Sequence, residues 1–188
     1  MTEDRHLPPF ILSNPLRVLE PSPLRIVAQY LPESGVICDL GSGPGYFTEK
    51  IAKMRPKAKV IAIDPDSRAV DVLRRKVEAR GLKNVEAHLS RASELGFIPD
   101  GSVDFIFSHL MLCCAVDHRG AVAEALRILR GGGMIFMSVT GSGRKSRDVR
   151  DVDSEEWEGI MHLFNAFASG RSVAYRWFLG RKGAGKDY

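Results

Sequence analysis

The sequence has little cysteine and no long run of apolar residues. Its three cysteines are an adjacent pair, Cys113 and Cys114, and the distant Cys38. An odd number at these spacings predicts no disulfide framework and fits a reducing compartment. No apolar run approaches the ~20 residues that a membrane-spanning helix needs, and the first residues lack the continuous apolar segment of a signal peptide. We therefore expect a soluble, cytoplasmic protein that does not enter a membrane.

A strong excess of either charge is also missing. The formal net charge is +4, and neither cluster of basic residues, at 144–150 and at 171–186, has the aromatic interleaving of an obvious nucleic-acid-binding module. Histidine and cysteine do not recur at spacings typical of metal ligands. We therefore expect no metal site. A nucleic acid or a protein remains open as an alternative partner.

The length of 188 residues fits a single domain. Five of the ten prolines lie within the first 23 residues, which predicts a proline-rich arm over 1–22 packed on the domain. Ser22 and Pro23 then have the pattern of a helix start. We place the domain at 23–182 and a flexible tail at 183–188.

Between residues 36 and 139 short apolar runs alternate with amphipathic segments. This pattern predicts an α/β fold with a mostly parallel sheet covered by helices on both faces. The expected strands are 36–40, 59–63, 85–89, 103–108 and 134–139, and the expected helices are 47–54, 67–80 and 118–129. A ligand should lie over the carboxyl ends of such strands.

The most specific motif lies within residues 36–48. An apolar run ends in Asp39, and Gly41, Gly43 and Gly45 then lead into the predicted helix. Glycines at this turn let the backbone approach a nucleotide-type ligand. A dinucleotide-binding motif would have its third glycine where Tyr46 stands. The spacing therefore disfavours a nicotinamide cofactor.

This motif is the first of four sequence motifs that follow one another along the chain. The others are the strand ending in Asp64, the segment 90–104, and residues 126–133 with their glycine turn. Together they resemble the class I, Rossmann-like S-adenosylmethionine-dependent methyltransferases, most of all the small-molecule enzymes of the ubiquinone and menaquinone biosynthesis type. The resemblance implies a Rossmann-like doubly wound sheet. After a predicted helix over 154–168, the strand at 173–179 leaves few residues for the family's two closing strands, so we expect that end of the sheet to be truncated or compressed.

The resemblance also implies S-adenosylmethionine as the cofactor and a role for each part of the motif. The backbone of Gly41, Ser42, Gly43 and Gly45 would meet the carboxylate of its methionine moiety, and Asp39 would accept from the ammonium group. Asp64 would accept from the two ribose hydroxyls, and the neighbouring Pro65 would cover the adenine.

Two further segments of the resemblance concern the adenine and the acceptor. Arg91 stands where family members often carry an acid that accepts from the adenine amine, so only the backbone amide of Ala92 is carried over. After the fourth strand, Ser108, His109 and Leu110 would lie where cofactor and acceptor meet. His109 is the candidate general base, although a packing role is the commoner one for such a histidine.

The sequence thus predicts a methyltransferase with an unidentified, small-molecule acceptor. An RNA or protein methyltransferase and a non-catalytic S-adenosylmethionine-binding partner subunit remain alternatives. No Asn-Pro-Pro-Tyr-type tetrad follows the fourth strand, which disfavours methylation of adenine or glutamine amino groups. The pair Cys113 and Cys114 indicates buried helical cysteines rather than a site for a soft metalloid. Neither the acceptor nor the oligomeric state follows from these residues.

Overall fold

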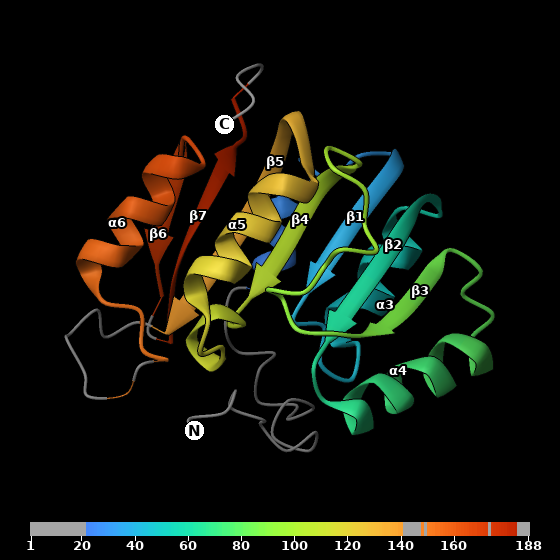
Figure 1. Cartoon of the computed structure of the whole chain (residues 1–188). Coiled ribbons are helices and arrows are strands. Elements are labelled where there is room, and N and C mark those ends of the chain that lie inside the picture. The colour runs from blue at the N-terminus through green and yellow to red at the C-terminus, as the bar shows by residue number, and fades with distance from the viewer. Residues whose placement is uncertain (1–21, 141–147, 149, 173, 184–188) are drawn as a thin grey trace.

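The computed structural model describes residues 22–140, 148, 150–172 and 174–183. They form one sheet of seven strands in the order β3-β2-β1-β4-β5-β7-β6, with helices on both faces (Figure 1). The strands β1 to β5 pair in parallel, and β7 is antiparallel to both β5 and β6. The predicted Rossmann-like, mostly parallel α/β fold is confirmed. The arm over 1–21 and the tail over 184–188 lie outside the described residues.

The elements follow the predicted alternation of strand and helix. The strands are β1 (Ser34–Leu40), β2 (Lys57–Asp64), β3 (Val85–Leu89), β4 (Val103–His109), β5 (Leu129–Thr140), β6 (Ala168–Arg171) and β7 (Tyr175–Arg181). The helices are α2 (Pro23–Val27), α3 (Tyr46–Met54), α4 (Ser67–Ala79), the 3-10 helix η2 (Leu112–Cys114), α5 (His118–Ile128) and α6 (Ser154–Leu163).

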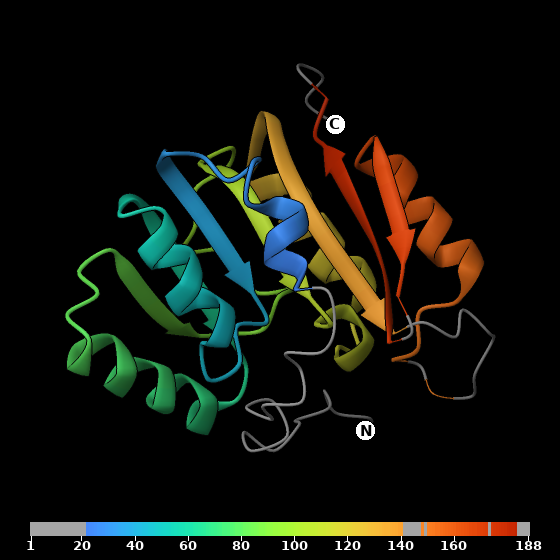
Figure 2. The same cartoon turned by 180° about the vertical axis from the view of Figure 1, so that it is seen from behind.

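The central strands are buried on both faces, which explains why they are apolar nearly throughout. On one face, α2 and α3 cover an apolar cluster that includes Ile37, Phe105 and Phe136. The rear view shows these two helices on this face of the sheet (Figure 2). On the other face, α5 and α6 cover a second apolar cluster around Ile106 and Ile135. Helix α4 packs against β2 and β3 at one end of the sheet. The sheet is therefore a rigid support for the loops at its carboxyl edge.

The end of the chain differs from the prediction in one respect. The predicted helix over 154–168 ends at Leu163, and Ala168 already begins β6. Asn165, with φ of 44°, lies in the left-handed region and stops the helix. Because the helix ends early, enough residues remain for both closing strands, β6 and β7. Of these two strands only β6, with four residues, is short. The apolar spacing of three to four residues continued past the true helix end and led the sequence-based prediction too far.

Candidate cofactor and acceptor site

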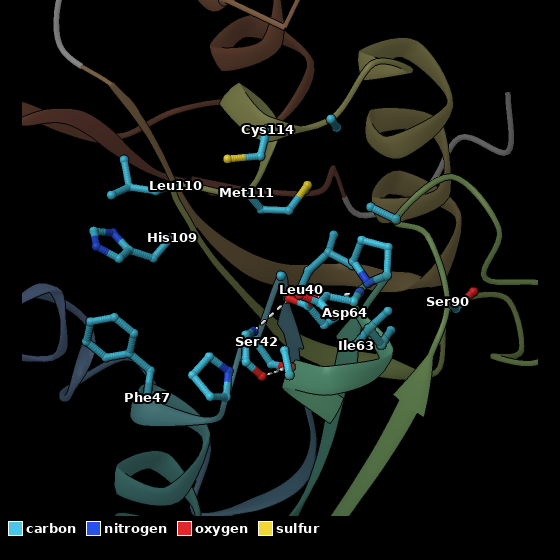
Figure 3. A pocket seen from close by; sticks show the side chains of 18 of the residues that line it. Leu40, Ser42, Phe47, Ile63, Asp64, Ser90, His109, Leu110, Met111 and Cys114 are labelled. Atoms are coloured by element: carbon cyan, nitrogen blue, oxygen red, sulfur yellow. Dashed lines mark hydrogen bonds between the residues drawn. The ribbon is translucent and has the colours of Figure 1, made fainter. Parts of the chain in front are cut away.

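A pocket opens where β1, β2 and β4 end (Figure 3). The glycine turn after β1 and the residues after β2 form one side of it, and the loop after β4 forms the other. In Figure 3 Phe47 lies beside His109, Ser42 lies between Phe47 and Asp64, and Leu110, Met111 and Cys114 lie above them. The strand order reverses between β1 and β4, which are neighbours in the sheet. A crevice forms at such a reversal, and ligands of open α/β sheets bind there.

Positive φ angles at three glycines give the turn after β1 its shape. They are 85° at Gly41, 52° at Gly43 and 85° at Gly45. A Cβ at Gly41 would come within 2.5 Å of the Met111 side chain across the pocket. The amides of Gly41 and Ser42 both donate to the carbonyl of Ile63 at 2.9 Å, which joins the turn to β2. Glycine is therefore required at Gly41 both by the backbone angle and by the close approach of the facing loop.

Asp64 connects the two walls of this half of the pocket. Its Oδ2 accepts a hydrogen bond from the amide of Gly43 at 2.7 Å, and its Oδ1 accepts from the amide of Asp66 at 2.9 Å. Each carboxylate oxygen has more than one acceptor direction, so a carboxylate held in this way suits a ligand that donates from hydroxyl groups. The carboxylate is thus held in place before any ligand binds.

Asp39 lies beneath the turn and is not among the pocket-lining residues. Only 2% of its surface is exposed, and its Oδ2 accepts from the hydroxyl of Thr48 at 2.6 Å. Burial raises the pKa of Asp39 to about 7; the Thr48 hydrogen bond opposes this shift and the charge of Asp64 adds to it. Its carboxyl group therefore changes charge near neutral pH, one hydrogen bond away from α3.

His109 ends β4 and lines the pocket. Its ring meets those of Phe47 and Tyr175 edge to face, with centroids 5.1 Å away in both cases. Its Nδ1 lies 2.7 Å from the hydroxyl of Ser138, its partner in register on β5. The next residue, Leu110, has φ of 58°, which is unusual for a residue with a side chain. The chain turns sharply there into the loop that carries Met111.

The remaining pocket wall is apolar and carries sulfur. Met111, Cys114 and Ala115 line it from η2 and its flanks. Cys113 is buried beside them, and a hydrogen bond from Cys114 lowers the pKa of Cys113, although burial acts in the opposite direction. Within the described residues, no group of three or more histidine, cysteine, aspartate or glutamate side chains could hold a metal ion.

The structure brings together seven of the ten residues predicted from sequence. The residues that line the pocket are Gly41, Ser42, Gly43, Asp64, Pro65, Ala92 and His109. Asp39, Gly45 and Ser108 lie just outside it. Gly45 caps α3 and packs on Leu73. Ser108 is fully buried and points to the face of α5, because successive side chains of a strand alternate between faces. Its hydroxyl has no hydrogen-bond partner among the described residues.

The sequence analysis did not single out Phe47, Asp66, Met111, Cys114 and Ala115 as pocket residues. Asp66 caps α4 by accepting from the amide of Arg68, which is the role its position before the helix indicates. The loop over 110–115 carries no recognisable motif, and only the strand order reveals what it faces. Arg91 is exposed and is not among the pocket-lining residues.

Part of the second basic cluster has structural roles. The Arg176 side chain is 5% exposed, lies over the Trp157 ring and donates to the carbonyls of Val152 and Asp153. Lys182 donates to the carbonyl of Leu129. The first cluster falls largely within 141–147 and at 149, outside the described residues. No helix of the described part is long and apolar enough to cross a membrane.

Comparison with known proteins agrees with this geometry. Residues 38–137, more than half of the chain, match the family model described as methyltransferase domain. A malonyl-[acyl-carrier protein] O-methyltransferase from Methylococcus capsulatus is 31% identical over 156 residues, which cover 76% of this chain and 50% of that protein. A trans-aconitate 2-methyltransferase from Azoarcus is 31% identical over 109 residues, which cover 58% of this chain and 40% of the relative. The chain thus spans half or less of the length of these two relatives.

A solved structure extends the likeness to nearly the whole fold. The crystal structure of a SAM-dependent methyltransferase from Aquifex aeolicus superposes with a TM-score of 0.78 at 22% identity, covering 94% of this chain and 99% of that one. This match covers more of the chain than the residues of the family model do. The ubiquinone and menaquinone subgroup is not singled out by these relatives. The chain belongs to the methyltransferase domain family and has the fold of the class I S-adenosylmethionine-dependent methyltransferases.

Proposed function

We propose that this protein binds S-adenosylmethionine in the pocket after β1 and β2 and transfers its methyl group to a small-molecule acceptor. The observation that carries the proposal is Asp64, whose carboxylate is held by two backbone amides beside the glycine turn. A rigid carboxylate next to an open backbone turn suits a ligand that has neighbouring hydroxyls and an amino-acid end. The relative named for trans-aconitate supports a small-molecule acceptor, whereas the other relative is named for a malonyl group carried on acyl-carrier protein.

The residues of the pocket fit the parts of such a cofactor. Asp64 would accept from the ribose hydroxyls, and Pro65 with Ala92 would line the adenine. The amides of the Gly41–Gly45 turn would meet the carboxylate. Asp39 would act from beneath the turn, through water or after a small shift of the backbone, since its side chain is buried. When bound, S-adenosylmethionine supplies an electrophilic methyl group on a sulfonium.

The acceptor side would be the wall made by His109, Leu110, Met111 and Cys114. The rigid edge would hold the acceptor and the methyl group in line. Such positioning alone can lower the activation free energy by up to ~7–11 kcal/mol, which is sufficient for a large acceleration. Ser108, predicted at this position, would act only through packing of β4.

A methyl-transfer screen tests the proposal. Purified protein is incubated with methyl-labelled S-adenosylmethionine and a panel of small acids, phenols, amines and RNA. We expect label on a small molecule and a loss of at least 100-fold in Asp64→Asn, with Asp71→Asn on exposed α4 surface as the control. Transfer to RNA or to protein alone would favour the alternative acceptors. Tight cofactor binding with no transfer to any acceptor would favour a non-catalytic binding subunit.

A further inference from the structure

The hydroxyl of Ser138 is a buried polar group beside His109. Ser138 lies on β5 with none of its surface exposed. Its Oγ accepts from the amide of Leu110 at 3.2 Å and lies 2.7 Å from Nδ1 of His109. Serine is unusual among its neighbours on this strand, since Phe136, Met137 and Val139 are apolar and buried. A polar side chain at such a position is costly unless its hydrogen bonds are made.

The position of hydrogen on His109 follows from these two contacts. A hydroxyl has one hydrogen to donate, and among the described residues the acceptor within reach of Ser138 is Nδ1 of His109. If Nδ1 instead carried hydrogen, the serine hydrogen would be buried without an acceptor, which is unfavourable. The neutral ring therefore accepts at Nδ1 and carries its hydrogen on Nε2. In the charged ring Nε2 carries hydrogen as well. Nε2 is thus a donor in both states.

We propose that Ser138 is a positioning residue that holds His109 as a hydrogen-bond donor, and that the methyl acceptor is a carboxylic acid which His109 binds without deprotonating. This inference rests on the proposed function and names the class of its acceptor. It replaces the general-base role predicted for His109, because a nitrogen that already carries hydrogen cannot remove a proton from an acceptor.

The surroundings of His109 favour an anionic partner. The rings of Phe47 and Tyr175 pack edge to face with the imidazole, so two of its neighbours are aromatic. A donor in such apolar surroundings gains most from an oxygen that carries charge. A carboxylic acid has already lost its proton at neutral pH and needs no base to become a nucleophile, unlike an alcohol, a phenol or an ammonium group.

The transfer then balances without a proton step. One oxygen of the carboxylate accepts from Nε2–H of His109, and the other oxygen forms a bond to the methyl carbon. The bond between that carbon and sulfur breaks, and its electron pair stays on sulfur, which becomes a neutral thioether. The products are a methyl ester and S-adenosylhomocysteine. His109 has the same hydrogens before and after.

Nitrogen NMR of the histidine rings tests the tautomer without any ligand. The protein is labelled with ¹⁵N-histidine at a pH where the ring is neutral, and the His109 signals are assigned by their loss in His109→Gln. We expect hydrogen on Nε2 in the wild type and a shift toward a mixture in Ser138→Ala, whereas Ser169→Ala, at an exposed position of β6, changes nothing. Hydrogen on Nδ1 of His109 in the wild type would overturn the proposal.

Activity tests the acceptor class. Methyl esters release their label as methanol in mild alkali, so we expect alkali-labile label on acids. His109→Gln keeps a donor and should retain activity within about tenfold, while His109→Ala should lose about 100-fold; a general base would make both losses 10²–10⁴-fold. Alkali-stable label on an amine or alcohol contradicts the acid class. Failure to bind S-adenosylhomocysteine would end the proposed function, but it would leave the tautomer result standing.

Discussion

The buried carboxyl group of Asp39, beneath the glycine turn, makes the stability of the fold depend on pH. Its pKa is raised to about 7 from an ordinary value of 3.8, mainly by burial. Between these values the unfolded chain has released a proton that the folded chain keeps, so the contribution to stability falls as the pH rises from about 4 to about 7. Above pH 7 both states are ionised and the loss is complete.

We predict that Asp39→Asn is more stable than the wild type by about 2 kcal/mol at pH 8, because an amide avoids burying a charge and can still accept from Thr48. The difference should shrink toward zero near pH 4. Urea unfolding of both proteins at pH 4.5 and pH 8 measures it. An equal difference in the free energy of unfolding at the two pH values would contradict the raised pKa.

Individual residues were predictable where chemistry requires one type. Asp64 and the three glycines are examples, since no other residue supplies a rigid carboxylate or a turn with positive φ at such close approach. Ser138 could not be found in this way. Its role depends on the register of β5 with β4, which places it opposite His109, and a lone serine within an apolar strand carries no motif.

The glycine turn and α3 form one element, and Gly45 joins them. A Cβ on Gly45 would overlap Cδ1 of Leu73 on α4, and its φ of 85° is unfavourable for any other residue. We predict that Gly45→Ala lowers the free energy of unfolding by about 2–4 kcal/mol, from backbone strain together with overpacking.

Gly81 provides a matched control for this substitution. Its φ is 61°, yet a Cβ there would meet nothing within 4 Å. Gly81→Ala should therefore cost only the backbone term of about 1 kcal/mol. Thermal and urea unfolding of Gly45→Ala and Gly81→Ala separate the cost of the backbone conformation from the cost of the contact with Leu73. Equal losses would show that the contact with Leu73 does not matter.

The closing hairpin of β6 and β7 depends on Arg176. Truncation to alanine would leave the carbonyls of Val152 and Asp153 without their donor and would remove the contact with Trp157. We predict a loss of about 1–3 kcal/mol for Arg176→Ala. Arg171 lies opposite Arg176 in the register of β6 and β7 and is exposed. Arg171→Ala should therefore change the free energy of unfolding by no more than about 0.5 kcal/mol. Similar unfolding midpoints for the two variants would refute a structural role for Arg176.

Elements were easier to predict than their ends. Continuous apolar runs indicate buried parallel strands, and all five expected strands of the region 36–139 are present. The exact end of α6 was not predictable, because Phe164 and Phe167 continue the helical spacing although Phe164 is buried against Phe178 and Phe167 follows the turn at Asn165. Tertiary contacts, not local periodicity, decide this boundary.

At the scale of the whole molecule, the fold fixes where a ligand can bind but not what it is. The sheet brings the ends of β1, β2 and β4 together, and these ends carry the turn, the carboxylate and the histidine. The loop over 110–115 gives the acceptor side its shape, and no pattern in the sequence describes that shape. The proposal for the cofactor therefore rests on residue types, whereas the proposal for the acceptor rests on geometry.

The most direct test of this account is calorimetric titration of the folded protein with S-adenosylhomocysteine. We predict one site in the wild type and at least 100-fold weaker binding in Asp64→Asn, with Asp71→Asn unchanged and all three proteins shown to be folded by their cooperative thermal transitions. Absence of binding by the folded wild type, or equal affinity in Asp64→Asn, would contradict the central claim that the carboxylate beside the glycine turn holds the cofactor.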